Sequence, residues 1–255
     1  MKCRPRTSIV EKPTFDGHVF QRDPYEKVSS ILSGRSKDVG LSFHLVAVST
    51  LHAASKDENL RRVLDQGVLI CDSTPIAKFL NLTQGDFSVC RGTDFFRYAL
   101  SHKPNLGGHF FLGGTENTLN KMHDRVRRDF PAIQVVGKYS PPFHQSTSID
   151  EIVSRVQLSK PAYVWVGMGS PKQDFIAEAI STRTGITTFA VGAAFDFLAG
   201  TVPESPNFLK GSGLEWLYRL CLEPKRLWKR YVFGNFFFIR VALRSLPSQI
   251  SCKNR

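Results

Sequence analysis

The sequence has few cysteines, few acidic residues and no long apolar run, and each shortage excludes a class of protein. The five cysteines among 255 residues lie far apart without a CxxC pair. Neither a disulfide framework nor a zinc-finger spacing is therefore present, and a reduced, cytosolic protein is the simplest interpretation. No stretch reaches the roughly 20 apolar residues of a membrane span. The basic N-terminus lacks the apolar core of a secretory signal.

Common metal and phosphate motifs are also missing. The sequence has no HExxH, no DxD and no cluster among its seven histidines, so we expect neither a metal ion nor a cofactor. It has no GxxxxGK[ST] segment, so a P-loop is unsupported. After Gly167 and Gly169, the third glycine position of a dinucleotide fingerprint holds Lys172.

Positive charge is abundant and unevenly distributed. The chain carries 34 Lys and Arg against 22 Asp and Glu, a net charge of +12. Residues 211–255 contain nine Lys and Arg and two Asp and Glu, so this segment carries seven of the twelve net positive charges. This balance predicts an anionic partner, whether nucleic acid, anionic lipid or a phosphorylated substrate. A solvated basic tail is the alternative interpretation.

Apolar segments alternate with amphipathic ones from residue 41 onward, which is typical of an α/β fold. The segments predict strands at 41–49, 67–72, 108–114, 132–137, 162–167 and 186–192. They predict helices at 50–66, 74–80, 93–102, 115–130, 147–159 and 170–184. We expect a Rossmann-like, doubly wound and mostly parallel sheet over 41–205. Residues 1–40 remain unassigned, and 206–255 form a basic helical appendage.

Ligands of such sheets bind at the carboxyl ends of the strands. The loops of interest therefore follow Ile70, Leu112, Val166 and Val191.

The segment "YVWVGMGSPKQDFIAEAI" places a glycine turn between a strand and a helix. Gly169 permits tight backbone geometry, Ser170 is a candidate helix cap, and Pro171 suits the first helical position. The helix N-terminus and Lys172 would attract an anion, and Gln173 adds a hydrogen-bonding carboxamide. The pattern favours a sugar-nucleotide diphosphate, although an ordinary strand–helix turn also uses these residue types.

Two further strand ends carry candidate residues. Gly113 and Gly114 either approach a nucleotide or only turn the chain, and Thr115 is a plausible cap of the next helix. Asp72 follows a strand, where it either caps a helix or accepts a proton from a substrate hydroxyl. Asp196 lies in an apolar segment and needs a hydrogen-bond partner. Asp196 is therefore either a structural anchor or a ligand contact.

The C-terminal segment "GLEWLYRLCLEPKRLWKRYVFGNFFFIRVALRSL" interleaves basic and large apolar residues. This pattern fits a helix in an anionic membrane interface. A helix packed on the domain is the alternative, and the two are compatible. No nucleic-acid-binding module surrounds the basic residues, so we expect no nucleic-acid partner.

Several motifs together resemble one family. "HFFLGGTENTLNKMHDRVRRDFPAIQVVGKYSPPF", "VWVGMGSPKQDFI" and "FAVGAAFDFLAGTVPESPNFLKGSGLEWLYRLCLEPKRLWKR" are similar to segments of the WecG/TagA/CpsF family of bacterial glycosyltransferases. The resemblance runs from about Leu41 to Val232 and is strongest from His109.

The resemblance implies an inverting, metal-independent transferase that moves a sugar, often N-acetylmannosamine, from a UDP-sugar to a polyprenyl-diphosphate-linked saccharide. The transferred sugar would be of the N-acetylmannosamine type or a hexose, and the product would belong to a surface polysaccharide or an exopolysaccharide. The resemblance also implies a peripheral position on the cytoplasmic face of the plasma membrane, reached through the basic appendage. The oligomeric state stays open.

Motif by motif, the family's catalytic aspartate corresponds to Asp72 and its glutamine to Gln173. Arginines of the family's appendage correspond to Arg219 and Arg226, with Lys229 at a further basic position. Ser73, Thr74 and Arg91 are the candidates for the acceptor side.

The sequence departs from the family pattern at three places. Ser73 follows the aspartate where glycine is usual, and Ala47 or Ser49 stands near a usual asparagine. Val89 occupies a position that is usually arginine, while Arg91 lies beside Gly92. A catalytically impaired nucleotide-sugar-binding or scaffold protein is therefore the alternative.

Overall fold

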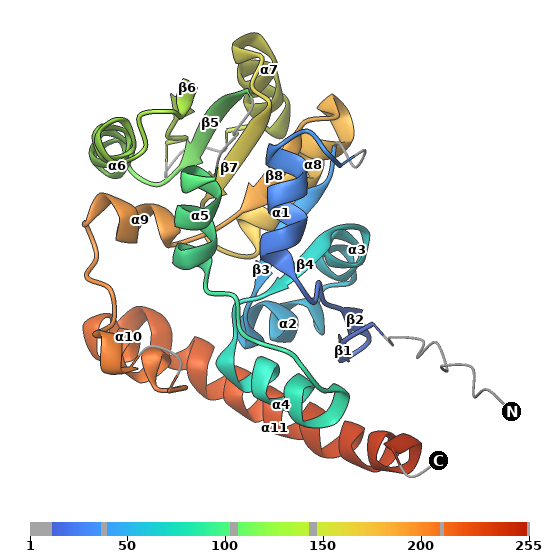
Figure 1. Ribbon diagram of the computed structural model, residues 1–255. Helices are drawn as coiled ribbons and strands as arrows, with labels where there is room; N and C mark the ends of the chain where they lie inside the picture. The colour runs from blue at the N-terminus through green and yellow to red at the C-terminus, as the bar shows by residue number, and fades with distance from the viewer. Residues whose placement is uncertain (1–11, 37–39, 103–106, 143–146, 210–211, 254–255) are drawn as a thin grey trace, which may run out of the picture.

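The protein folds around one six-stranded parallel sheet (Figure 1). The computed structural model describes residues 12–36, 40–102, 107–142, 147–209 and 212–253. The strand order is β4-β3-β8-β7-β5-β6, and all neighbours in this sheet are parallel. The strands are β3 (Ser42–Val46), β4 (Val68–Cys71), β5 (Gly108–Gly113), β6 (Gln134–Tyr139), β7 (Tyr163–Gly167) and β8 (Thr187–Ala190). All six predicted strands are confirmed.

Helices cover both faces of the sheet, as the sequence predicts for a doubly wound fold. One face carries α1 (Pro24–Leu32), α5 (Gly92–Ser101), α6 (Glu116–Asp129) and α9 (Ala194–Ala199). The other carries α2 (Val48–Ala54), α3 (Glu58–Gln66), α7 (Ile149–Ser159) and α8 (Lys172–Thr184). Because successive strand residues point to opposite faces, Phe111 packs with Phe96 and Phe195 while Phe110 packs among the residues of α7 and α8.

Two predicted boundaries are wrong around β3. The strand predicted over 41–49 ends at Val46, where pairing with Cys71 of β4 ends, and α2 begins at Val48. The single helix predicted over 50–66 is two helices. Asp57 separates them because its carboxylate accepts the backbone N–H groups of Asn59 and Leu60 and so caps α3.

The described part of the unassigned N-terminal segment joins the core. A short hairpin of β1 (Thr14–Phe15) and β2 (His18–Val19) precedes α1. Phe15 packs edge-on against Phe79 of α4 (Thr74–Gln84) and stacks on Phe238, with ring centroids 5.3 and 5.6 Å apart. The hairpin therefore links α4 to the C-terminal helix.

The C-terminal segment comprises the short helix η1 (Asn207–Leu209), α10 (Glu215–Leu222) and the long α11 (Pro224–Lys253). Helix α11 lies along α2 and α4 at the lower edge of the molecule in Figure 1. Among its described side chains, Leu227, Phe237 and Val241 are buried. No described helix combines the length and apolar content that crossing a bilayer requires.

Candidate active site

A cavity of about 770 Å³ opens at the carboxyl ends of the strands. Segments that follow β3, β4, β5, β7 and β8 form one side of it, and α10 and the first turns of α11 form the other. The cavity therefore lies where the parallel sheet predicts a ligand, and all four loops singled out in the sequence contribute to it. The appendage supplies a wall that the sheet alone lacks.

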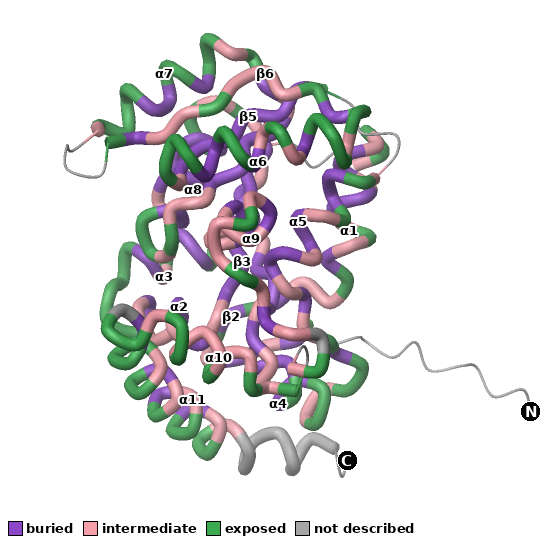
Figure 2. Tube along the Cα trace, turned by 90° about the vertical axis from the view of Figure 1, so that its left-hand side faces the viewer, coloured by how far each residue is buried: buried purple, intermediate pink, exposed green. Residues whose placement is uncertain are grey.

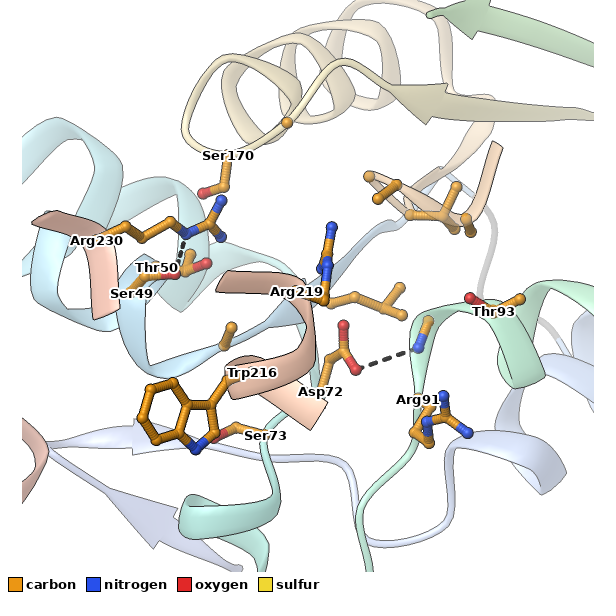
Figure 3. Close-up of a pocket in the computed structure, with 18 of the residues that line it drawn as sticks. Ser49, Thr50, Asp72, Ser73, Arg91, Thr93, Ser170, Trp216, Arg219 and Arg230 are labelled. Carbon is orange, nitrogen blue, oxygen red and sulfur yellow. Dashed lines mark hydrogen bonds between the residues drawn. The ribbon is translucent and has the colours of Figure 1, made fainter. Parts of the chain in front are cut away.

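Asp72 lines this cavity directly after β4, and its carboxylate points into it (Figure 3). Its backbone N–H donates to the Val46 carbonyl at 3.0 Å, and its carboxylate accepts the N–H of Gly92 at 3.2 Å. It therefore binds the first turn of α5 rather than capping α4, whose N-cap is Ser73.

Burial raises the pKa of Asp72 to about 6. The Gly92 N–H and the positive charges of Arg219 and Arg91 oppose this rise, and the negative charge of Glu215 adds to it. A carboxyl with this pKa is mostly ionised at neutral pH, yet basic enough to take a proton.

The turn between β7 and α8 presents Lys172 and Gln173 to the cavity. Gly169 has φ +78° and donates its N–H to Oε1 of the buried Gln173 at 3.0 Å. The predicted cap by Ser170 is wrong. Helix α8 begins at Lys172, so Pro171 is the N-cap and not the first helical residue that the sequence predicted. Gln173 reaches back to the turn in place of a serine cap. The Ser170 hydroxyl is buried without a hydrogen-bond partner among the described residues.

A buried pair fixes the start of α8 against the sheet. The Asp174 carboxylate accepts a hydrogen bond from Nδ1 of His44 at 2.9 Å, and Nε2 of His44 lies 3.0 Å from the Ser42 hydroxyl. Asp174 and His44 are both fully buried. The residues that precede Asp174 are therefore held at a defined position below the cavity.

The turn between β5 and α6 has separate structural and lining residues. A side chain at Gly113 (φ +110°) would come within 2.6 Å of the Gly167 carbonyl, so this buried glycine permits the close approach of β5 and β7. Gly114 lines the cavity and donates its N–H to Gly167 at 2.9 Å. The predicted cap is confirmed, because the Thr115 hydroxyl accepts the N–H of Thr118 at 3.1 Å.

Asp196 of α9 has the hydrogen-bond partners that its apolar surroundings require. The hydroxyls of Thr118 and Thr201 both donate to its Oδ1 at 3.2 Å. Asp196 therefore anchors α9 to α6, and it also lines the cavity.

Helices α10 and α11 bring further polar groups to the cavity. The Arg219 guanidinium lies over the Phe197 ring at 5.2 Å, and its charge acts on Asp72. Arg230 donates to the Ser49 hydroxyl at 2.7 Å, where α11 crosses the start of α2. The Trp216 and Tyr231 rings pack 5.6 Å apart and close this side.

The sequence predictions missed Glu215, Trp216 and Arg230 as lining residues. Glu215 and Arg219 are four residues apart on α10, which places them on one helix face. That spacing is readable in the sequence, but it does not tell which surface the face meets.

The remaining predicted residues divide into three groups. Ser73, Thr74 and Arg91 line the cavity, as do the departures from the family pattern at Ala47 and Val89. Lys229 is exposed outside the lining, with its ammonium 5.6 Å from the Trp228 ring. Arg226 belongs to α11, but its side chain lies outside the described part. Within the described residues, no group of three or more His, Cys, Asp or Glu could hold a metal ion.

Comparison with known proteins identifies a family model that covers most of the chain and relatives that cover part of it. The model of the family described as "Glycosyl transferase WecG/TagA/CpsF family" matches residues 21–251. A protein of Bacillus spizizenii named N-acetylglucosaminyldiphosphoundecaprenol N-acetyl-beta-D-mannosaminyltransferase is 33% identical over 122 residues, 48% of this chain and 46% of the relative. A protein of the same name from Bacillus subtilis is 26% identical over 196 residues, 75% of each chain. The first match thus spans about half the length of that relative.

Proposed function

The chain belongs to the WecG/TagA/CpsF family of glycosyltransferases, and from this premise we propose that it transfers a sugar from a UDP-sugar to a polyprenyl-diphosphate-linked saccharide with inversion. The names of the two relatives make N-acetylmannosamine the first candidate for the sugar and lipid-linked N-acetylglucosamine the first candidate for the acceptor. The observation that carries the proposal is the convergence of the Asp72 carboxylate and the Arg219 guanidinium on one cavity.

The donor would bind along the turns after β5 and β7. The N-terminus of α8 and the exposed ammonium of Lys172 supply positive charge for its diphosphate. Gly114 allows backbone contact with the nucleotide, while Gln173 and Asp196 offer hydrogen-bonding groups to it. Gly113 would act indirectly, because it permits the close approach of β5 and β7.

The reaction would be a single displacement. The acceptor hydroxyl oxygen forms a bond to the anomeric carbon while Asp72 takes the hydroxyl proton. The bond from that carbon to the diphosphate oxygen breaks, and its electron pair leaves with UDP, so the anomeric configuration inverts. Arg219, together with Arg226 of the same appendage, would stabilise the charge that develops on the leaving diphosphate. Ser73, Thr74 and Arg91 would contact the acceptor. No step uses a metal ion.

A screen of UDP-sugars tests this proposal. We expect UDP-N-acetylmannosamine and a short polyprenyl-diphosphate-N-acetylglucosamine to give a product heavier by one N-acetylhexosamine residue in mass spectrometry. Proton NMR of the new linkage would then show the inverted anomer. Retention of configuration would exclude the single displacement.

The outer side of α11 would hold the enzyme on the cytoplasmic face of the plasma membrane. Trp228, Val232, Phe236, Ile239 and Leu243 recur every three or four residues and are 47% to 70% exposed. They form one apolar stripe, and exposed residues recur along α11 in Figure 2. Lys225, Lys229, Arg240 and Arg244 accompany the stripe. Such a surface would enter a membrane interface and attract anionic lipid.

Replacing Phe236 and Ile239 together by Asp is expected to weaken binding to phosphatidylglycerol vesicles by at least about tenfold, since two apolar side chains are lost and two negative charges are added. Vesicle co-sedimentation measures this. The matched control is Leu158→Asp, which changes an exposed leucine on α7 at the far end of the molecule. Equal binding by the double variant and the control would exclude this membrane surface.

The departures from the family pattern favour one second candidate. Ala47 and Val89 line the cavity with apolar side chains, so a nucleotide-sugar-binding protein with impaired catalysis would have the same fold. Calorimetric binding of UDP-N-acetylmannosamine without any transfer product would support that candidate.

A further inference from the structure

One ion pair joins the appendage to the loop beside Asp72. Nη2 of Arg91 lies 2.9 Å from Oε2 of Glu215, the first residue of α10. Nη1 of the same guanidinium lies 3.4 Å from Asp94, on its own helix α5. Both members of the pair are largely shielded from solvent, with side chains 17% and 21% exposed. Such a forked and shielded contact restricts motion more than an exposed pair does.

The pair connects two parts of the proposed catalytic centre. Gly92, the next residue after Arg91, donates the N–H that Asp72 accepts. Glu215 begins the helix that carries Arg219 one turn later. The Arg91–Glu215 ion pair therefore couples the position of the Gly92 N–H, which Asp72 accepts, to the position of Arg219. Figure 3 labels Asp72, Arg91 and Arg219 around the cavity.

The same groups surround Asp72 electrostatically. Arg91 faces it from the start of α5, and Arg219 and Glu215 face it from α10. The neighbouring thiols of Cys71 and Cys90 are uncharged at neutral pH, because burial raises the pKa of each to about 12. Arg91 and Glu215 act on the carboxylate with opposite signs.

We propose that Glu215 is a positioning residue, which holds Arg91 against α10 and thereby fixes Arg219 and the Gly92 N–H around the reacting groups. This inference rests on the proposed role of Asp72 as the base. It assigns to the appendage a part in setting the basicity and geometry of the centre, in addition to its proposed contact with the membrane.

The experiment compares Glu215→Gln, Arg91→Met and their double variant in the full-length protein. Each single variant is expected to lower kcat about tenfold, because Arg219 is no longer held in place. The double variant is expected to be no slower than the slower single variant, because Glu215 is proposed to act through Arg91 and its loss adds nothing once Arg91 is gone. The donor and acceptor are UDP-N-acetylmannosamine and polyprenyl-diphosphate-N-acetylglucosamine.

The pH profile separates this role from a merely structural one. Glu215→Gln removes a negative charge and is expected to move the acidic limb of kcat/KM to lower pH. Arg91→Met removes a positive charge and is expected to move it to higher pH, each by about half a unit or more. Arg91→Lys keeps the charge and should restore the wild-type limb. The matched control is Glu151→Gln, which breaks an ion pair with Arg155 on α7 outside the cavity lining, and it should leave the limb in place.

Titration of the Asp72 carboxyl by carbon-13 NMR gives the same comparison without turnover. Opposite displacements in the two single variants support the inference, and equal or absent displacements overturn it. If Asp72→Asn keeps full transfer, the proposed base is wrong whatever these titrations show. If Asp72→Asn is inactive but the acidic limbs of Glu215→Gln and Arg91→Met do not move in opposite directions, only the role proposed for Glu215 is wrong.

Discussion

Asp72→Asn is expected to lower kcat by about 10²- to 10⁴-fold, which is the usual contribution of a positioned general base. Asparagine retains the shape of the side chain and an oxygen that can accept the Gly92 N–H, but it cannot take the acceptor's proton. Binding of the UDP-sugar should change little, because Lys172 and the start of α8 are untouched. Single-turnover transfer and calorimetric titration of UDP measure the two effects.

The folded state should tolerate this substitution. Burial raises the pKa of Asp72 from 3.8 to about 6, so the native carboxyl holds its proton more tightly than the unfolded one. That contribution to stability is present at low pH and is lost as the pH rises through about 6. A neutral side chain removes the cost of the buried charge, so the melting temperature at neutral pH should be equal or higher. A folded variant with near-wild-type transfer would show that Asp72 is not the base.

The same pKa makes the reaction of the unaltered protein pH-dependent. Because the ionised carboxylate is the active form, kcat/KM is expected to fall as the pH drops through about 6.

Arg219→Met is expected to lower kcat by about 10²- to 10³-fold, the range found when one stabilising donor is removed from a transition state. Methionine retains an unbranched apolar side chain but loses the charged guanidinium that lies over the Phe197 ring. UDP should still bind through Lys172, so the loss should appear in kcat more than in KM. Steady-state kinetics over a range of donor concentrations separate the two.

The matched control for this variant is Arg155→Met. The Arg155 guanidinium lies 4.3 Å from the Tyr139 ring on the surface of α7 and β6, so it makes the same type of contact away from the cavity. It should leave kcat unchanged. If Arg219→Met and Arg155→Met behave alike, Arg219 does not stabilise the leaving diphosphate.

The sequence was sufficient to predict the parallel sheet and the position of Asp72 directly after one of its strands. Six apolar runs separated by amphipathic segments leave a parallel sheet covered on both faces as the stable arrangement. Residues directly after those runs must then gather at one edge, which is why Asp72, Gly114 and Gln173 were predicted near a ligand and do line the cavity. These inferences depend on local periodicity and on a general property of parallel sheets.

Only the tertiary structure decided what surrounds Asp72. The Gly92 N–H that it accepts is 20 residues away, and the Arg91–Glu215 and Ser49–Arg230 contacts join segments separated by more than 100 residues. Local spacing indicates that Glu215 and Arg219 share a face of α10, but not that this face closes the cavity. The position of α10 over the cavity follows from the way α11 packs, with Leu227, Phe237 and Val241 buried against the body of the protein. Apolar burial is non-directional, so where a helix packs depends on the shape of the whole surface and not on its own sequence alone.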